Sequence, residues 1–213
     1  QPRDNDLVLA THGRGIWIID DLTPLRALTP ALLQEEAAFL PTRPQQQRIR
    51  AGGGWVEGDA SYTGESAPSS VTITYYQKAR HLFGKLKIEV LDDKGNVVDT
   101  LPASKRRGIN RVAWSMNVAP PRVPPAAQVA GSATRGPRVV PGNYTVRMTK
   151  GAKTYETKVT VGLDPRSPFT VAERSEQFDA AMTVKAMFGT MTDLVAHIQA
   201  VRTGAGAAMA KLP

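Results

Sequence analysis

The chain has 213 residues, of which 41% are hydrophobic, and its 27 Lys and Arg against 19 Asp and Glu give a formal net charge of +8. This composition can form a folded core, and the 18 glycines and 16 prolines favour a turn-rich, mainly β protein. The absence of cysteine excludes disulfides and thiolate metal sites, and no apolar run approaches the roughly 20 residues of a spanning helix. No signal peptide is visible, so we expect a mature or fragmentary form that starts at Gln1.

The first predicted element is a β-hairpin. Two apolar strands, 7–11 and 16–19, flank His12-Gly13-Arg14-Gly15, whose glycines allow the positive φ of a tight reversal. Both strands are apolar at nearly every position, so both faces need cover, and a two-stranded hairpin alone is marginally stable. We therefore predict that the hairpin pairs with a sheet outside this chain or is reused for docking. The residues expected to contact a partner are Leu7, Leu9, Ile16, Trp17 and Ile18.

A connector and then a series of short strands follow the hairpin. Residues 24–38 carry a helical stripe of leucines, with Thr23 as the expected N-cap, and residues 45–50 form a first strand or an extended arm. Residues 52–64 are predicted to be loop. Strand-like patterns cover 71–75, 86–91, 97–98, 108–116, 143–149 and 154–161, with hairpin turns at 92–96 and 150–153. Six or seven such strands predict an Ig-like, fibronectin-type antiparallel β-sandwich.

A proline-rich segment, residues 118–141, interrupts the predicted sandwich. Because proline removes backbone donors, we expect the segment either to be disordered or to lie along a partner. It belongs to a stretch from residue 100 to residue 155 that contains no acidic residue. Such a positive field can attract acidic proteins, anionic lipids, polyanionic glycans or nucleic acid, or can merely serve solubility. The cations assigned to this surface are Lys105, Arg106, Arg107, Arg111, Arg122, Arg135 and Arg138.

The C-terminal region is predicted to form one long helix. Thr170 and Glu173 match a capping box, and Gly204 and Gly206 are expected to end the helix near Thr203. Apolar residues then recur at alternating spacings of four and three, a pattern that packs either on the rest of the chain or on a partner. This stripe comprises Ala180, Val184, Met187, Met191, Leu194, Ile198 and Val201, of which Met187, Met191, Leu194 and Ile198 are assigned to partner binding.

No constellation of residues points to catalysis. The three histidines, His12, His81 and His197, lack metal-ligand spacing, and His197 forms an i,i+4 pair with Asp193 that suits a structural role. The paired carboxylates at 20–21 and 92–93 follow strands, where aspartate favours turns. No phosphate-binding loop or Asp-box repeat is present, and the basic stretch has no nucleic-acid recognition motif. We expect no enzymatic activity, no cofactor, no metal and no nucleic-acid partner.

Three motifs resemble a known family. Residues 5–26 resemble the end of the last propeller blade in large bacterial sortilin-type, BNR-repeat proteins, often labelled glycosyl-hydrolase-like. Residues 64–68 before 71–75 resemble that family's entry into its sandwich, and residues 141–146 resemble a late strand. The resemblance covers roughly residues 5–200, although the propeller that should precede residue 1 is absent. It implies an Ig-like sandwich, a helical tail and an extracytoplasmic location, in the bacterial periplasm or at the cell surface.

These inferences divide the chain into three regions. Residues 1–44 form the hairpin and connector, residues 45–165 the sandwich with its insertion, and residues 166–213 the helical tail. Our leading hypothesis is a non-catalytic assembly module, an extrinsic subunit or C-terminal fragment that docks on other protein chains. An anionic membrane surface is a further candidate partner. The alternative is an accessory domain of a glycan-active propeller enzyme whose active site lies outside this chain.

Overall fold

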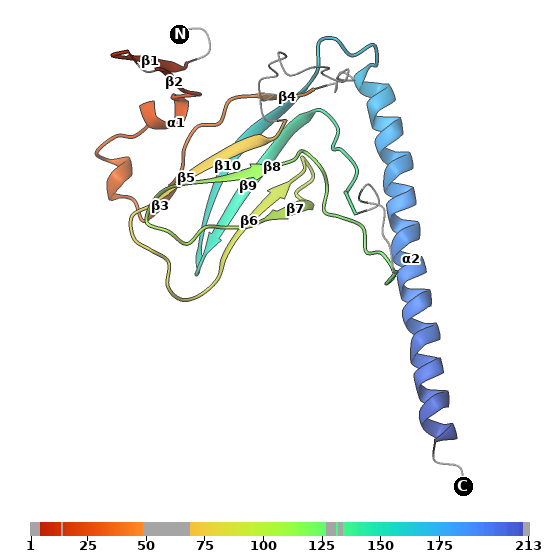
Figure 1. The fold of residues 1–213 in the computed structure, drawn as a ribbon. Coiled ribbons are helices and arrows are strands. Elements are labelled where there is room, and N and C mark those ends of the chain that lie inside the picture. The colour runs from red at the N-terminus through yellow and green to blue at the C-terminus, as the bar shows by residue number, and fades with distance from the viewer. Residues whose placement is uncertain (1–4, 14, 49–68, 127–130, 132–133, 211–213) are drawn as a thin grey trace. The chain divides into compact units, whose positions relative to one another are not determined.

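The computed structural model consists of two compact units and describes residues 5–13, 15–48, 69–126, 131 and 134–210 (Figure 1). The first unit holds Gln1–Met116 and Pro141–Ser167, and the second holds Asn117–Val140 and Pro168–Pro213. The proline-rich segment is thus grouped with the C-terminal helix, whereas the sequence-based division placed it with the sandwich. Arg14, the predicted loop at 52–64 and the motif at 64–68 lie outside the described residues.

A five-stranded sheet, in the order β4-β10-β9-β6-β7, forms one layer of the first unit. Neighbouring strands are antiparallel, except that β4 runs parallel to the end of β10. The predicted strands at 86–91, 97–98, 143–149 and 154–161 are confirmed, and residues 45–47 are strand rather than an arm. The strands are β4 (Gln45–Gln47), β6 (Leu86–Leu91), β7 (Val97–Leu101), β9 (Gly142–Lys150) and β10 (Lys153–Leu163).

A three-stranded antiparallel sheet, β3-β5-β8, accompanies it. Strands β5 (Val71–Gln77) and β8 (Gly108–Trp114) confirm two predicted strands, although β8 stops before Met116. Strand β3 (Ala37–Phe39) pairs with β5 and was missed, because its three residues overlap the leucine-rich segment that we predicted as a helical connector. Three residues are too few to show a strand period.

The connector between hairpin and sheets contains short helical turns, in agreement with the helical pattern of leucines predicted there. They are α1 (Thr23–Arg26) and a 3-10 turn at Leu32–Gln34. The expected N-cap was wrong, because Leu22 holds that position without a side-chain hydrogen bond. The Thr23 hydroxyl instead accepts a hydrogen bond of 2.8 Å from the side-chain amide nitrogen of Asn5.

Both sheets contribute to one hydrophobic core. In β8 the side chains of Asn110, Val112 and Trp114 are buried while their neighbours are not, as expected of a sheet with one covered face. The ring of Trp114 meets that of Tyr144 from β9 edge-on, with 5.1 Å between centroids. Ile73, Tyr75, Ile88, Val90, Val146 and Met148 are fully buried. The first unit is therefore mainly β, as predicted, with several antiparallel sheets.

Two tight turns confirm the predicted hairpins of the sheets. The Asp92 carboxylate accepts hydrogen bonds from the backbone nitrogens of Lys94 and Asn96, at 3.0 and 2.8 Å. Gly95 and Gly151 have φ of 83° and 59°, the left-handed region that favours glycine. Of the paired carboxylates at 92–93, Asp92 therefore has a structural role in the turn.

The second unit is built on the helix α2 (Val171–Met209). Its predicted capping box is confirmed, because the Thr170 hydroxyl accepts from the Glu173 backbone nitrogen at 3.2 Å while the Glu173 carboxylate accepts from the Thr170 nitrogen at 2.7 Å. The predicted end near Thr203 was wrong, since Gly204 and Gly206 lie inside the helix. Each interior glycine costs about 1 kcal/mol, but the alanines that flank them are the best helix formers.

The described residues of the proline-rich segment contact one another and helix α2. The Val118 nitrogen donates to the Pro137 carbonyl at 2.9 Å. A Cβ on Gly136 would lie 1.9 Å from the Val118 carbonyl oxygen, so only glycine fits there. The Thr192 hydroxyl donates to the Arg122 carbonyl at 3.0 Å. The segment therefore contacts a helix of its own chain at Arg122, an arrangement that neither of our two expectations included.

Candidate protein-binding surfaces

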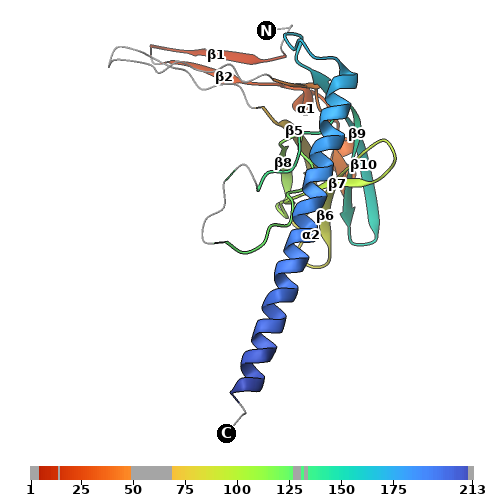
Figure 2. The same cartoon turned by 90° about the vertical axis from the view of Figure 1, so that its right-hand side faces the viewer.

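The N-terminal hairpin forms a two-stranded sheet of its own, as predicted. Strand β1 (Leu7–Thr11) pairs with β2 (Gly15–Ile19), with Leu7 opposite Ile19 and Thr11 opposite Gly15 (Figure 2). Every residue of both strands is exposed. The five residues assigned to partner contact are all among them, and Ile16 and Trp17 are exposed at 72% and 68%. Neither face of this sheet is covered by the described residues.

Polar contacts close the base of the hairpin. The Asp6 carboxylate accepts from the Asp21 backbone nitrogen at 2.9 Å, and the Asn5 carbonyl accepts from the Leu22 nitrogen at 2.8 Å. Asn5 and Asp21 both have positive φ, which Asn and Asp tolerate better than other side chains. In the pair of carboxylates at 20–21, Asp21 therefore has a structural role at the end of the hairpin.

The seven cations assigned to a basic surface divide between the two units. Lys105, Arg106, Arg107 and Arg111 belong to the first, whereas Arg122, Arg135 and Arg138 belong to the second. Arg122 is in an ion pair with Asp193 at 2.8 Å. The Asp193 carboxylate was expected to pair with His197, but it accepts this hydrogen bond from the proline-rich segment instead.

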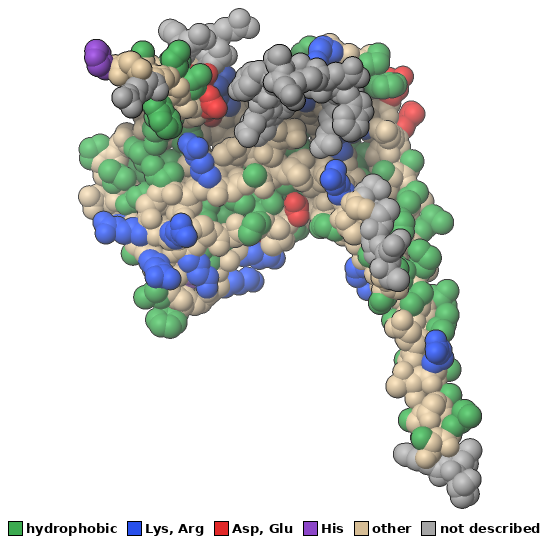
Figure 3. Space-filling model, in the orientation of Figure 1, with side chains coloured by type: hydrophobic (Ala, Val, Ile, Leu, Met, Phe, Trp, Pro, Cys, Tyr) green, Lys and Arg blue, Asp and Glu red, His purple; other side chains and the backbone are tan. Residues whose placement is uncertain are grey.

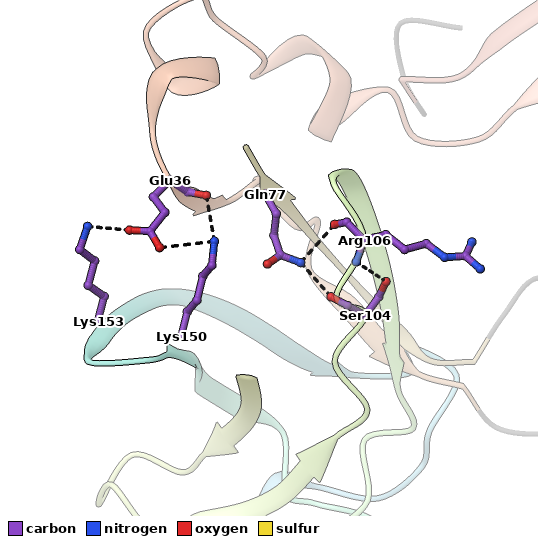
Figure 4. A network of polar contacts seen from close by, with 6 residues as sticks. All are labelled: Glu36, Gln77, Ser104, Arg106, Lys150 and Lys153. Carbon is purple, nitrogen blue, oxygen red and sulfur yellow. Dashed lines mark hydrogen bonds and ion pairs between the residues drawn. The ribbon is translucent and has the colours of Figure 1, made fainter. Parts of the chain in front are cut away.

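A polar clamp holds the backbone of the turn that carries three of these cations (Figure 4). The Gln77 amide nitrogen donates to the carbonyls of Ser104 and Arg106, at 2.8 and 3.2 Å. The Tyr75 hydroxyl donates to the Ser104 carbonyl at 2.9 Å and accepts from the Ser104 nitrogen at 2.7 Å. Figure 4 shows the Arg106 side chain directed away from Gln77. The clamp fixes this turn while the side chains of Lys105, Arg106 and Arg107 remain exposed.

Two lysines at the turn between β9 and β10 are paired. The Glu36 carboxylate lies 3.5 Å from the Lys150 Nζ and 2.6 Å from the Lys153 Nζ (Figure 4). The hydrogen bond from Lys153 lowers the pKa of Glu36 against the opposing effect of burial. Because Lys150 is only 7% exposed, this carboxylate balances a nearly buried charge. We assign these residues a structural role.

The sequence analysis missed one exposed hydrophobic site. Leu82 and Phe83, between β5 and β6, are exposed at 62% and 87%. They precede Gly84, whose φ is 87°. An apolar pair followed by glycine and flanked by cations could have indicated a protruding loop, but it lies between strands that have the same apolar composition.

The apolar stripe of α2 is exposed along its length. Met187, Met191, Leu194 and Ile198 are 44% to 64% exposed, and no residue of the helix is buried. At about 100° per residue, Gly189, Thr192 and Asp193 lie on the opposite side of the helix from the stripe. These three residues are the ones near Arg122, whose guanidinium lies 3.7 Å from a Cβ built on Gly189. The proline-rich segment thus contacts the polar side of the helix.

The histidines considered as candidate metal ligands lie in three different parts of the chain. Within the part of the chain that the structure describes, no three His, Asp or Glu side chains gather as metal ligands. His12 is exposed in the hairpin turn, His81 lies in the β5–β6 loop and His197 in α2. No helix among the described residues is long and apolar enough to cross a membrane.

The comparisons with known proteins add no relative. No protein-family model matches the chain. No curated protein and no solved structure matches it either.

Proposed function

We propose that this chain is a non-catalytic protein-binding module, docked through its hairpin on a larger extracytoplasmic or membrane-associated assembly. The observation that carries the proposal is the uniform exposure of β1 and β2. Leu7, Val8 and Leu9 on one strand, and Ile16–Ile19 on the other, are all large hydrophobic side chains at 39% exposure or more. Monomeric proteins rarely expose contiguous apolar patches of this kind unless the patch binds something.

The chemistry of the hairpin favours a β-sheet of another protein chain as its occupant. A strand with one covered face alternates apolar and polar side chains, whereas a strand buried on both faces is apolar throughout. Strands β1 and β2 have the nearly uniform apolar composition of a strand buried on both faces, yet both are exposed. Each also has an edge that pairs with no strand among the described residues, so the hairpin can extend a partner's sheet by backbone hydrogen bonds. The partner must then cover both faces.

The helix stripe, the type of the sheets and the location complete this proposal. The stripe on α2 is a second candidate contact for a protein partner, because the proline-rich segment contacts the opposite side of the helix. We also propose that the two sheets are of the Ig-like, fibronectin type, a common architecture of binding domains. The extracytoplasmic location rests on the resemblance to sortilin-type, BNR-repeat proteins.

The experiment compares hydrogen exchange of the isolated chain with that of the chain in its native assembly. We expect the amides of 7–11 and 15–19 to exchange quickly alone and slowly in the assembly. Trp17→Glu should abolish co-purification with the assembly without changing the fold. Ile109→Glu, at a residue 42% exposed in β8, is the matched control and should leave co-purification intact. Slow exchange of the hairpin in the isolated chain, or normal assembly of the Trp17 variant, would contradict the proposal.

An accessory domain of a glycan-active propeller enzyme is the second candidate. The exposed hairpin also suits it, because an incomplete propeller blade would leave two strands in this condition. Asp-box repeats encoded in frame before residue 1 would favour this candidate. A separate reading frame that begins close to residue 1 would favour the assembly module.

A further inference from the structure

The loop between β5 and β6 carries Phe83, at 87% exposure the most exposed large hydrophobic side chain of the described residues, next to Leu82 at 62%. The His81 backbone nitrogen donates to the Lys105 carbonyl at 3.0 Å, which ties this loop to the turn between β7 and β8. Figure 1 shows both loops at the same end of the sheets. The clamp formed by Tyr75 and Gln77 holds the second loop in turn.

The two joined loops carry five exposed cations in addition to this apolar pair. We call the set the basic tip: Leu82 and Phe83 together with Arg80, Lys85, Lys105, Arg106 and Arg107. Residues 66–88 and 100–155 contain no Asp or Glu. Glu35 and Glu36 precede β3, which pairs with β5, and the Glu36 carboxylate is already paired with Lys150 and Lys153. Figure 3 shows hydrophobic side chains at the lower left end of the first unit, with Lys and Arg side chains around them.

We infer that the basic tip binds an anionic lipid surface. Leu82 and Phe83 enter the boundary between headgroups and acyl chains, and the five cations contact lipid phosphates. Interfacial membrane binding combines these two features, buried apolar area and attraction to anionic headgroups. A protein partner would need a pocket to cover a side chain as exposed as Phe83, whereas a fluid interface accepts a protruding one. The inference involves neither the hairpin nor α2, so it can be tested independently of the proposed function.

The cations and the apolar pair are expected to contribute similarly to the affinity for the membrane. Each Lys or Arg near an anionic surface contributes about fivefold to affinity, and this contribution falls with ionic strength. Full burial of a Leu or Phe side chain contributes at least about tenfold. Loss of either feature should therefore be measurable.

The first test is co-sedimentation of the full chain with vesicles of phosphatidylcholine, with and without phosphatidylglycerol. We expect binding only with phosphatidylglycerol, and weaker binding at high salt. Leu82→Ser with Phe83→Ser should weaken it at least about tenfold, while Val97→Ser, at a residue 50% exposed in β7, should leave it unchanged. Arg106→Gln with Arg107→Gln should weaken it about 25-fold. Lys94→Gln with Lys158→Gln removes the same charge at exposed residues outside the tip and should have a much smaller effect.

The second test locates the contact. Since the chain has no cysteine, Phe83→Cys and Val97→Cys provide single labelling sites for an environment-sensitive fluorophore. We expect a blue shift on vesicle addition at position 83 and none at position 97. Failure to bind phosphatidylglycerol vesicles at low salt would overturn the inference. So would equal losses in the two charge variants, which would indicate adhesion through net charge, or retention of full affinity by the Leu82 and Phe83 variant. Tip variants that disturb only binding to an acidic protein would assign the surface to that protein instead.

Discussion

Two β-hairpins of this protein differ in what covers them. Along β9 fully buried side chains alternate with less buried ones, and the buried set, Tyr144, Val146 and Met148, belongs to the core, as do Val159 and Val161 of β10. Strands β1 and β2 have the same antiparallel pairing but are exposed at every residue. The first hairpin has polar residues where it faces water, whereas the second has almost none. Burial on one side suffices for an alternating strand, while a uniformly apolar one needs cover on both sides.

The largest expected effect comes from comparing two tryptophans. Trp114 is fully buried and Trp17 is 68% exposed. Trp114→Ala should lower the free energy of unfolding by about 3–5 kcal/mol, because it leaves a cavity in the core. Trp17→Ala should change it by less than about 0.5 kcal/mol. Denaturant unfolding of both variants measures the difference. A large loss for Trp17 would mean that the hairpin is covered within the chain.

A smaller effect is expected at the turns of the two hairpins. Gly151, between β9 and β10, has φ of 59°, and Gly13, between β1 and β2, has φ of 76°. An L-residue in this region costs about 1–2 kcal/mol, and no neighbouring atom blocks a Cβ at either site. Gly151→Ala should lower global stability by about 1 kcal/mol. Gly13→Ala should increase hydrogen exchange in 7–11 and 15–19 and leave the unfolding midpoint unchanged, since the hairpin opens separately. Equal shifts of the midpoint would show that both hairpins unfold together.

The smallest effect concerns the acid stability of the sheets. Because the pKa of Glu36 is lowered from 4.5, its contribution is present above that pH and is lost as the pH falls through the folded-state pKa. As its side chain is 44% exposed, the contribution should stay below about 1 kcal/mol. Glu36→Gln should lower the unfolding midpoint at pH 7 but not at pH 3. Glu35→Gln, the exposed neighbour, is the control, and an equal change at both pH values would exclude the pairing as the cause.

Much of the fold follows from local pattern. Period-two alternation with turn residues at 92–96 and 150–153 was sufficient to predict most strands of both sheets, and the capping box placed the start of α2. Prediction failed where the signal is short or ambiguous. Strand β3 has only three residues, and the glycines near residue 204 are outweighed by neighbouring alanines. The pattern also could not show that Leu82 and Phe83 protrude, because exposed and buried apolar residues look alike in sequence.

The sequence by itself determined that the hairpin forms and that both its faces are apolar, because turn glycines and uniform strand composition act over a few residues. Only the tertiary structure decided that the described chain covers neither face. It also decided that Arg122 pairs with Asp193, and that the loop of Leu82 and Phe83 is tied to Lys105 through the His81 nitrogen, because these contacts join residues far apart in sequence. Long-range contacts depend on how whole elements pack, and no local pattern encodes that packing.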